Sequence, residues 1–212
     1  MGVIIAQSTA GLPGSSSNLI LYKENIGTVI PPSPVGSNSI VLGSGAQTAV
    51  SATNSLAIGE QSLARIPGGV VQASGRFASS GDAQTGKYLL RSHTTNSTET
   101  ELFIDGTGGT KRLVLPDDST WTFRGIITGH RTDISDGHAG FSFEGVIYRI
   151  AGNASVSFQG RPSTSTIARN NFAWGIKLYA DTTNGSLTIT CTGQNGKTIR
   201  WVAMVETVEV TN

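Results

Sequence analysis

The chain has 212 residues, of which 27 are glycine and only 14% are charged, and its 15 basic and 14 acidic residues leave a formal net charge of +1. The sequence has no cluster of basic residues of the kind typical of nucleic-acid-binding proteins, so no nucleic-acid partner is expected. A composition rich in Gly, Ser, Thr and Asn disfavours helices and suits short strands joined by tight turns, which predicts an all-β protein.

The first segment, residues 1–36, mixes short apolar runs with turn-like stretches and holds too few large apolar residues to close a core. In a solvated tail, the apolar side chains of Val3–Ile5 and Leu19–Leu21 would stay in contact with water. They favour an N-terminal attachment arm that becomes ordered on another subunit over a flexible tail. Met1–Ala6 has no basic region and its apolar run is short, so neither a secretory signal nor membrane insertion is expected.

Residues 37–80 contain a repeat, because Asn38–Gly43 (NSIVLG) returns as Asn54–Gly59 (NSLAIG) sixteen residues later. Each copy predicts a short strand and a turn that must stack on a neighbour, since one unit cannot bury its apolar face alone. The same spacing leads to Gly27 and Gly75, where the glycine register is expected to continue. Two clear copies fall short of the roughly three that make a self-sufficient solenoid, so other copies of the chain are expected to supply the missing burial.

Residues 81–212 predict a C-terminal antiparallel β-sandwich of jelly-roll-like type, because short strand patterns are separated by turn dipeptides. The predicted strands are Tyr88–His93, Glu101–Asp105, Arg112–Leu115, Thr120–Thr128, Phe141–Ile150, Ser155–Gln159, Ala173–Ala180, Ser186–Cys191 and Thr198–Val208. The side chains expected to fill the core are Trp121, Phe123, Phe141, Phe143, Trp174 and Trp201. The single cysteine, Cys191, excludes an intrachain disulfide and is expected to be a buried thiol.

Gly81–Lys87 matches the first seven positions of a phosphate-binding loop. Tyr88 stands where a Ser or Thr should reach magnesium, and the residues after it have a strand pattern instead of a helical one. Nucleotide binding is therefore not expected.

The polar segment 129–138 (GHRTDISDGH) holds two imidazoles and two carboxylates. His130, Asp133, Asp136 and His138 could chelate a divalent ion. The Asp-Gly dipeptide is typical of a hairpin tip, however, and polar loops collect such residues, so no metal and no cofactor is expected. His130, Arg131, Asp133 and His138 are instead candidates for contact with a surface glycan. Hydrolase motifs are absent and the acidic residues are scattered, so the sequence predicts no enzyme.

The two repeat copies, Asn38–Gly43 and Asn54–Gly59, resemble the head repeats of trimeric autotransporter adhesins. This resemblance covers the repeat segment alone. It implies a left-handed parallel β-roll shared by three chains, with apolar residues facing the trimer axis. The side chains expected at that axis are Ile40, Leu42, Leu56 and Ile58.

The C-terminal region is similar to domains at the ends of bacteriophage tail-fibre and virion structural proteins. The segments that carry this similarity are Thr100–Gly106, Leu113–Pro116, Trp121–Phe123, Gly145–Ile147 and Lys197–Ala203. The resemblance implies a non-enzymatic homotrimer of the virion, assembled in the host bacterial cytoplasm. A short tail fibre would bind other virion proteins through residues 1–36 and a host glycan or protein through its C-terminal domain. The alternatives are a capsid decoration (cement) protein and, third, a glycan-cleaving tailspike.

Overall fold

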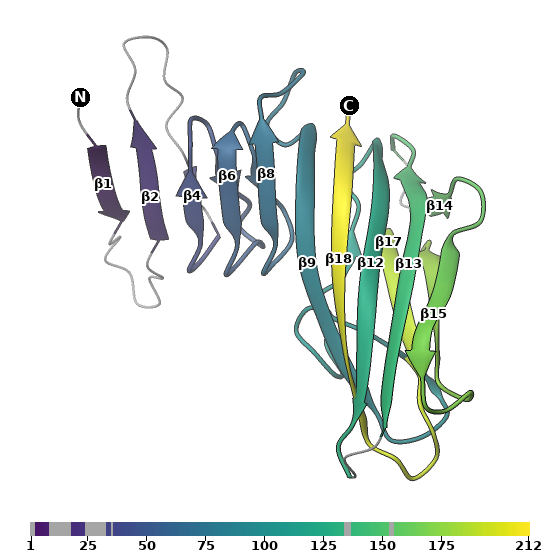
Figure 1. Ribbon diagram of the computed structural model, residues 1–212. Helices are drawn as coiled ribbons and strands as arrows, with labels where there is room; N and C mark the ends of the chain where they lie inside the picture. Colours follow the sequence, from purple (N-terminus) through teal and green to yellow (C-terminus); the bar gives the residue numbers. More distant parts are fainter. Residues whose placement is uncertain (1–2, 9–17, 24–32, 35, 134–136, 153–154) are drawn as a thin grey trace. The chain divides into compact units, whose positions relative to one another are not determined.

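The computed structural model describes residues 3–8, 18–23, 33–34, 36–133, 137–152 and 155–212, and every regular element in that part of the chain is a β-strand (Figure 1). The prediction of an all-β protein is confirmed. The chain divides into two compact units, Met1–Lys87 with Val208–Asn212, and Tyr88–Thr207. Among the described residues, no helix is long and apolar enough to cross a membrane.

The first unit is built around a parallel roll with two sheets, and Figure 1 labels the strands of one of them. The strands of one sheet are β4 (Ile40–Leu42), β6 (Leu56–Glu60) and β8 (Val70–Ser74), and those of the other are β3 (Ser33–Pro34), β5 (Gln47–Thr48) and β7 (Leu63–Ala64). The core holds the small side chains Val41, Ala46, Ala52, Ala57, Ala64 and Val71. Ile40 lies opposite Leu56, so the second repeat copy stacks on the first as predicted.

Two strands of the predicted arm extend the roll. β1 (Val3–Ser8) pairs antiparallel with β2 (Asn18–Lys23). β2 in turn pairs parallel with β4, where Leu19 lies opposite Ile40. Both apolar runs of the arm therefore lie in strands joined to the roll within one chain.

The Asn-Ser pair that opens each repeat sets the path of the coil. Asn38 and Asn54 have φ of 55° and 57°, the left-handed region that asparagine tolerates better than most residues. The Ser39 hydroxyl donates to the carbonyl oxygen of Ala52 (3.0 Å), and Ser55 makes the equivalent bond one coil later (3.1 Å). Both serines are buried, so their hydroxyls satisfy carbonyl groups that water does not reach.

The repeated glycines lie where one coil touches the next. A Cβ on Gly43 would lie 2.3 Å from the carbonyl oxygen of Gly59, and a Cβ on Gly59 would lie 2.0 Å from that of Ala73. Gly59 is opposite Ala73, fourteen residues later, because the last coil is two residues shorter than the first. The expectation that the glycine register reaches Gly75 is therefore wrong, and Gly27 lies outside the described residues.

Replacing Gly59 with alanine should destabilise the first unit, because the new Cβ would collide with a backbone oxygen. We expect a loss of about 1–3 kcal/mol from overpacking, in addition to the strain of a positive φ. Gly75→Ala is the matched control, since its φ is also positive (138°) but its Cβ would meet nothing within 4 Å. Thermal unfolding followed by circular dichroism compares the two variants, and equal midpoints would contradict the steric explanation.

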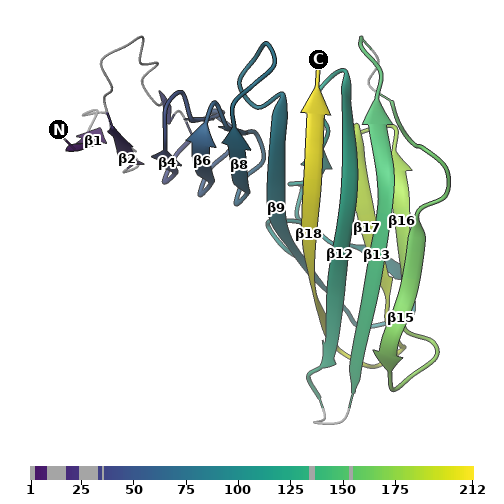
Figure 2. The same cartoon turned by 45° about the horizontal axis from the view of Figure 1, so that its top comes forward.

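The second unit is an antiparallel sandwich. In one sheet β9 (Ala83–Thr94), β18 (Ile199–Thr211), β12 (Ser119–Arg131) and β13 (His138–Arg149) lie in this order, and β14 (Val156–Phe158) and β15 (Ser163–Arg169) both pair with β13. The other sheet is centred on β17 (Ser186–Thr192), which pairs with β10 (Glu99–Glu101), β11 (Leu113–Val114) and β16 (Gly175–Asp181). β17 lies behind β12 and β13 in both views (Figures 1 and 2).

Aromatic side chains fill the second unit as predicted. Trp121, Phe123, Phe141, Phe143, Trp174 and Trp201 are all buried. Cys191 is fully buried as well, and this burial raises the pKa of its thiol. Five of the six aromatic residues lie in strands, whereas Trp174 comes just before β16 and not in a strand as predicted.

Candidate functional sites

The parallel sheet of the roll carries apolar side chains on its outer face. Ile40 and Val70 are 37% and 39% exposed, and Leu56 lies between them in register. Leu42 and Ile58 form a second, partly exposed pair on the same face. The four residues predicted for the trimer axis thus lie outside the roll's own core and point away from it.

The hairpin between β12 and β13 holds the predicted glycan-contact residues. His130 lies directly opposite His138, both are exposed, and their Nδ1 atoms are 3.3 Å apart. Arg131 donates through Nε and Nη2 to the two carboxylate oxygens of Asp133, which lowers the pKa of that carboxyl group. The structure therefore joins the four residues as two pairs, and Asp136 lies outside the described residues.

Among the residues that the structure describes, the histidine pair has no third side-chain ligand of the usual kinds. Within the described residues, no group of three or more His, Cys, Asp or Glu side chains is placed to hold a metal ion. Asp133, three residues after His130, is already bound at both oxygens by Arg131. The described residues therefore offer an ion at this hairpin two imidazole ligands.

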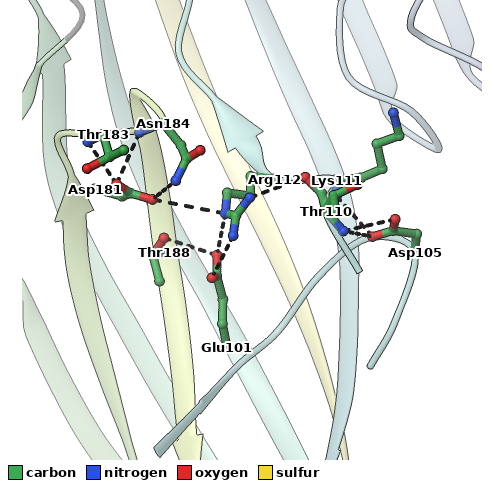
Figure 3. Close-up of polar contacts among 9 residues, drawn as sticks. All are labelled: Glu101, Asp105, Thr110, Lys111, Arg112, Asp181, Thr183, Asn184 and Thr188. Atoms are coloured by element: carbon green, nitrogen blue, oxygen red, sulfur yellow. Dashed lines mark hydrogen bonds and ion pairs between the residues drawn. The ribbon is translucent and has the colours of Figure 1, made fainter. Parts of the chain in front are cut away.

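The outer face of the four-stranded sheet carries an ion-pair cluster that the sequence analysis missed (Figure 3). Arg112 donates to both carboxylate oxygens of Glu101, from Nε at 3.0 Å and Nη2 at 3.2 Å. The Thr188 hydroxyl donates to the same carboxylate at 3.2 Å, and Asp181 lies 4.0 Å from the guanidinium. Arg112 also stacks on the ring of Phe103, 4.8 Å from its centroid. These charges satisfy one another, which suits a structural role.

Glu99 extends the same polar face and is strongly held in its ionised form. It accepts hydrogen bonds from Lys177 Nζ (2.6 Å) and from the Thr190 hydroxyl (2.6 Å). Burial acts to raise the pKa of Glu99, but the hydrogen bonds from Lys177, Thr190 and Tyr179 outweigh it and lower the pKa to about 2. A carboxyl group this acidic cannot donate a proton at neutral pH, so Glu99 is unsuited to general acid catalysis.

The Glu99 contacts predict a pH-dependent loss of stability. Because the folded-state pKa lies below the unfolded value of about 4.3, the stabilisation is present above that value and is lost as the pH falls toward 2. We expect Glu99→Gln to lower the unfolding midpoint at pH 7 and to unfold like the wild type near pH 2. Glu144→Gln, at an exposed position of β13, controls for the loss of one negative charge. A difference between wild type and Glu99→Gln that does not shrink on acidification would contradict this account.

The segment that resembles a phosphate-binding loop has a structural role. Asp82 is buried and accepts the backbone N–H groups of Phe77, Ala78 and Ser79 at 3.0, 2.6 and 2.6 Å. The chain then continues directly into β9 at Ala83. Five of the seven residues of the segment lie in β9, so no helix N-terminus follows to hold a phosphate.

No protein-family model matches the chain, and no curated protein matches it significantly. Among solved structures, the chain is similar to the tailspike protein gp49 of Acinetobacter baumannii bacteriophage Fri1, a capsular polysaccharide depolymerase, with a TM-score of 0.33 and 13% identity over 59% of this chain. It is also similar to the tailspike protein of Acinetobacter baumannii phage AM24, with a TM-score of 0.34 and 12% identity over 79% of this chain. Both similarities are distant, and the matches cover 18% and 33% of those tailspike chains.

Proposed function

We propose that the chain is a non-enzymatic structural protein of a bacteriophage virion, a short homotrimeric tail fibre whose C-terminal domain binds the host surface. The observation that carries the proposal is the row of Ile40, Leu56 and Val70 along the outer face of the roll. The resemblance of the C-terminal segments to the ends of phage tail fibres implies a place in the virion. Residues 1–36 would contact other virion proteins.

The composition of the roll supports assembly of three chains. Its core holds alanines and valines, whereas the larger Ile40, Leu56 and Ile58 lie outside it. Burial of apolar surface contributes about 25 cal/mol per Å², so small core side chains stabilise each coil little. Packing the outer rows of three chains against one another would bury the larger side chains. A native mass of 22.0 kDa, that of one chain, at micromolar concentration would contradict this assembly.

The proposal that the protein binds glycan without cleaving it is supported by how its acidic residues are held. Glu99, Glu101 and Asp133 each accept hydrogen bonds from a cationic side chain. Glycosidases need one carboxylic acid that can give up a proton and a second carboxylate opposite it. The purified protein should therefore bind host surface polysaccharide without releasing reducing ends, and steady release of such ends would favour the tailspike alternative.

A capsid decoration protein is the second candidate, and the strands of the arm favour it. β1 and β2 add an edge to the roll sheet that could pair with another subunit of a shell. Phage particles lacking the protein separate the two candidates. Intact heads that no longer adsorb to the host would support a tail fibre. Normal adsorption with heads that leak DNA on heating would contradict the fibre and support the decoration protein.

A further inference from the structure

Two of the three histidines of the chain meet at the end of the β12–β13 hairpin. We propose that His130 and His138 form a two-imidazole site for a divalent transition-metal ion of the Zn²⁺ class. The sequence pattern alone favoured an ordinary polar tip there, and the inference rests on the geometry of the two rings and of the backbone beneath them.

The backbone places the two imidazoles as close as an antiparallel pair allows. The Arg131 N–H donates to the carbonyl oxygen of Gly137 (2.8 Å), which makes the next pair, His130 and His138, a non-hydrogen-bonded one. Side chains approach most closely across such pairs. On its other side, His138 donates its N–H to Asn170 Oδ1 (2.7 Å) and accepts the Asn170 N–H (3.0 Å). β13 is therefore held on both sides at the histidine.

The ring positions fit two nitrogens that share an ion. Two nitrogens at about 2.0–2.1 Å from a tetrahedral Zn²⁺ are about 3.3–3.4 Å apart, and the centroids of the two rings are then about 5.2 Å apart. The Nδ1 atoms of His130 and His138 are 3.3 Å apart, with ring centroids at 5.3 Å and planes inclined by 17°. Rings joined head-on by one hydrogen bond at that separation would have centroids about 5.6 Å apart, and such bonds are usually shorter, at about 2.7–3.2 Å.

The electrostatic surroundings permit a bound cation. Arg131, the cation that follows His130 in the chain, is neutralised by its two bonds to Asp133, a carboxylate that also lies within the electrostatic reach of Lys197. Imidazole nitrogen favours Zn²⁺, Ni²⁺ and Cu²⁺ over Ca²⁺ and Mg²⁺, which prefer oxygen. Two protein ligands leave two positions of a tetrahedron for water or for an oxygen of a bound molecule. The ion would thus remain accessible at the surface of the hairpin.

Calorimetric titration of the full chain with ZnCl₂ and with CaCl₂ tests the site, using variants matched within the chain. His93 supplies the control, because it is also exposed but its Nδ1 lies 2.8 Å from the Thr107 hydroxyl instead of another imidazole. We expect one Zn²⁺ per chain, no response to Ca²⁺, and affinity reduced by more than about tenfold in His130→Ala and in His138→Ala. His93→Ala should bind as the wild type does.

A second measurement guards against variants that fail to fold. Zn²⁺ bound to the native state should raise the thermal midpoint of the wild type and of His93→Ala, and should leave His130→Ala and His138→Ala unchanged. Without Zn²⁺ all four proteins should unfold alike, since the three substituted histidines are all exposed. The proposal is overturned if the wild type binds no Zn²⁺ at about 100 μM, or if either hairpin variant binds it as tightly as the wild type.

Discussion

Leu56→Asp should dissociate the protein into monomers of 22.0 kDa while leaving each chain folded. Leu56 lies in the middle of the outer row, between Ile40 and Val70, so in the proposed trimer its three copies meet at the axis. Three carboxylates without partners would be taken out of water there, and each would cost several kcal/mol. Because Leu56 lies outside the core of the roll, the same change should leave the β-sheet signal in circular dichroism unchanged.

Val50→Asp is the matched control for this experiment. It also replaces an exposed apolar residue of the same unit with a carboxylate, since Val50 is 74% exposed, but it lies in a turn outside the outer row. Light scattering coupled to size-exclusion chromatography would give the mass of both variants. A trimer that survives Leu56→Asp would show that the outer row is not the interface, and a trimer lost equally in Val50→Asp would show that the effect is general.

The strands of the second unit were predictable because their side chains alternate between a buried and an exposed face. In β12, Trp121, Phe123 and Ile127 are buried, and exposed residues alternate with buried ones along the strand. β15 (Ser163–Arg169) escaped prediction because it has no such signal. It is exposed from Ser163 to Ala168 and is held by pairing with β13, a long-range contact that a local pattern does not record.

The repeat predicted that coils stack, but the number of residues in a coil is not the same throughout the roll. Ile40 reaches Leu56 after sixteen residues, whereas Leu56 reaches Val70 after fourteen. The shorter coil places Ala73, not a glycine, opposite Gly59. Periodicity in sequence thus indicates a stacking architecture, while the coil length depends on the turn that closes each coil.

The candidate sites were predictable only in part, because they depend on pairing between distant segments. His130 and His138 were recognised as possible ligands from their types, but the register of β12 and β13 decides that their rings face each other. Glu99 and Lys177 are far apart in sequence and meet only because β10 and β16 both pair with β17. No motif marks such a pair in advance.

Trp201→Ala should be among the most destabilising single changes in the second unit, with a loss of about 3–5 kcal/mol. Trp201 is fully buried, packs edge to face against Trp174 with ring centroids at 5.8 Å, and donates from Nε1 to the Thr94 hydroxyl at 3.0 Å. The backbone has also adapted to the ring, since a Cβ on Gly129 would lie 2.4 Å from it. Removing the indole would leave a cavity and a buried hydroxyl without its donor.

Two variants separate these contributions. Thr94→Val keeps the volume of the side chain and removes the hydrogen bond, which should cost about 1–3 kcal/mol because the indole N–H would be left buried and unpaired. Arg200→Ala, at the exposed position just before the indole on β18, should change stability by no more than about 0.5 kcal/mol. Denaturant unfolding followed by the fluorescence of the remaining tryptophans, Trp121 and Trp174, gives the three values. If Trp201→Ala cost no more than Thr94→Val, the indole would contribute mainly its hydrogen bond, and the packing of this core would depend on the other aromatic rings.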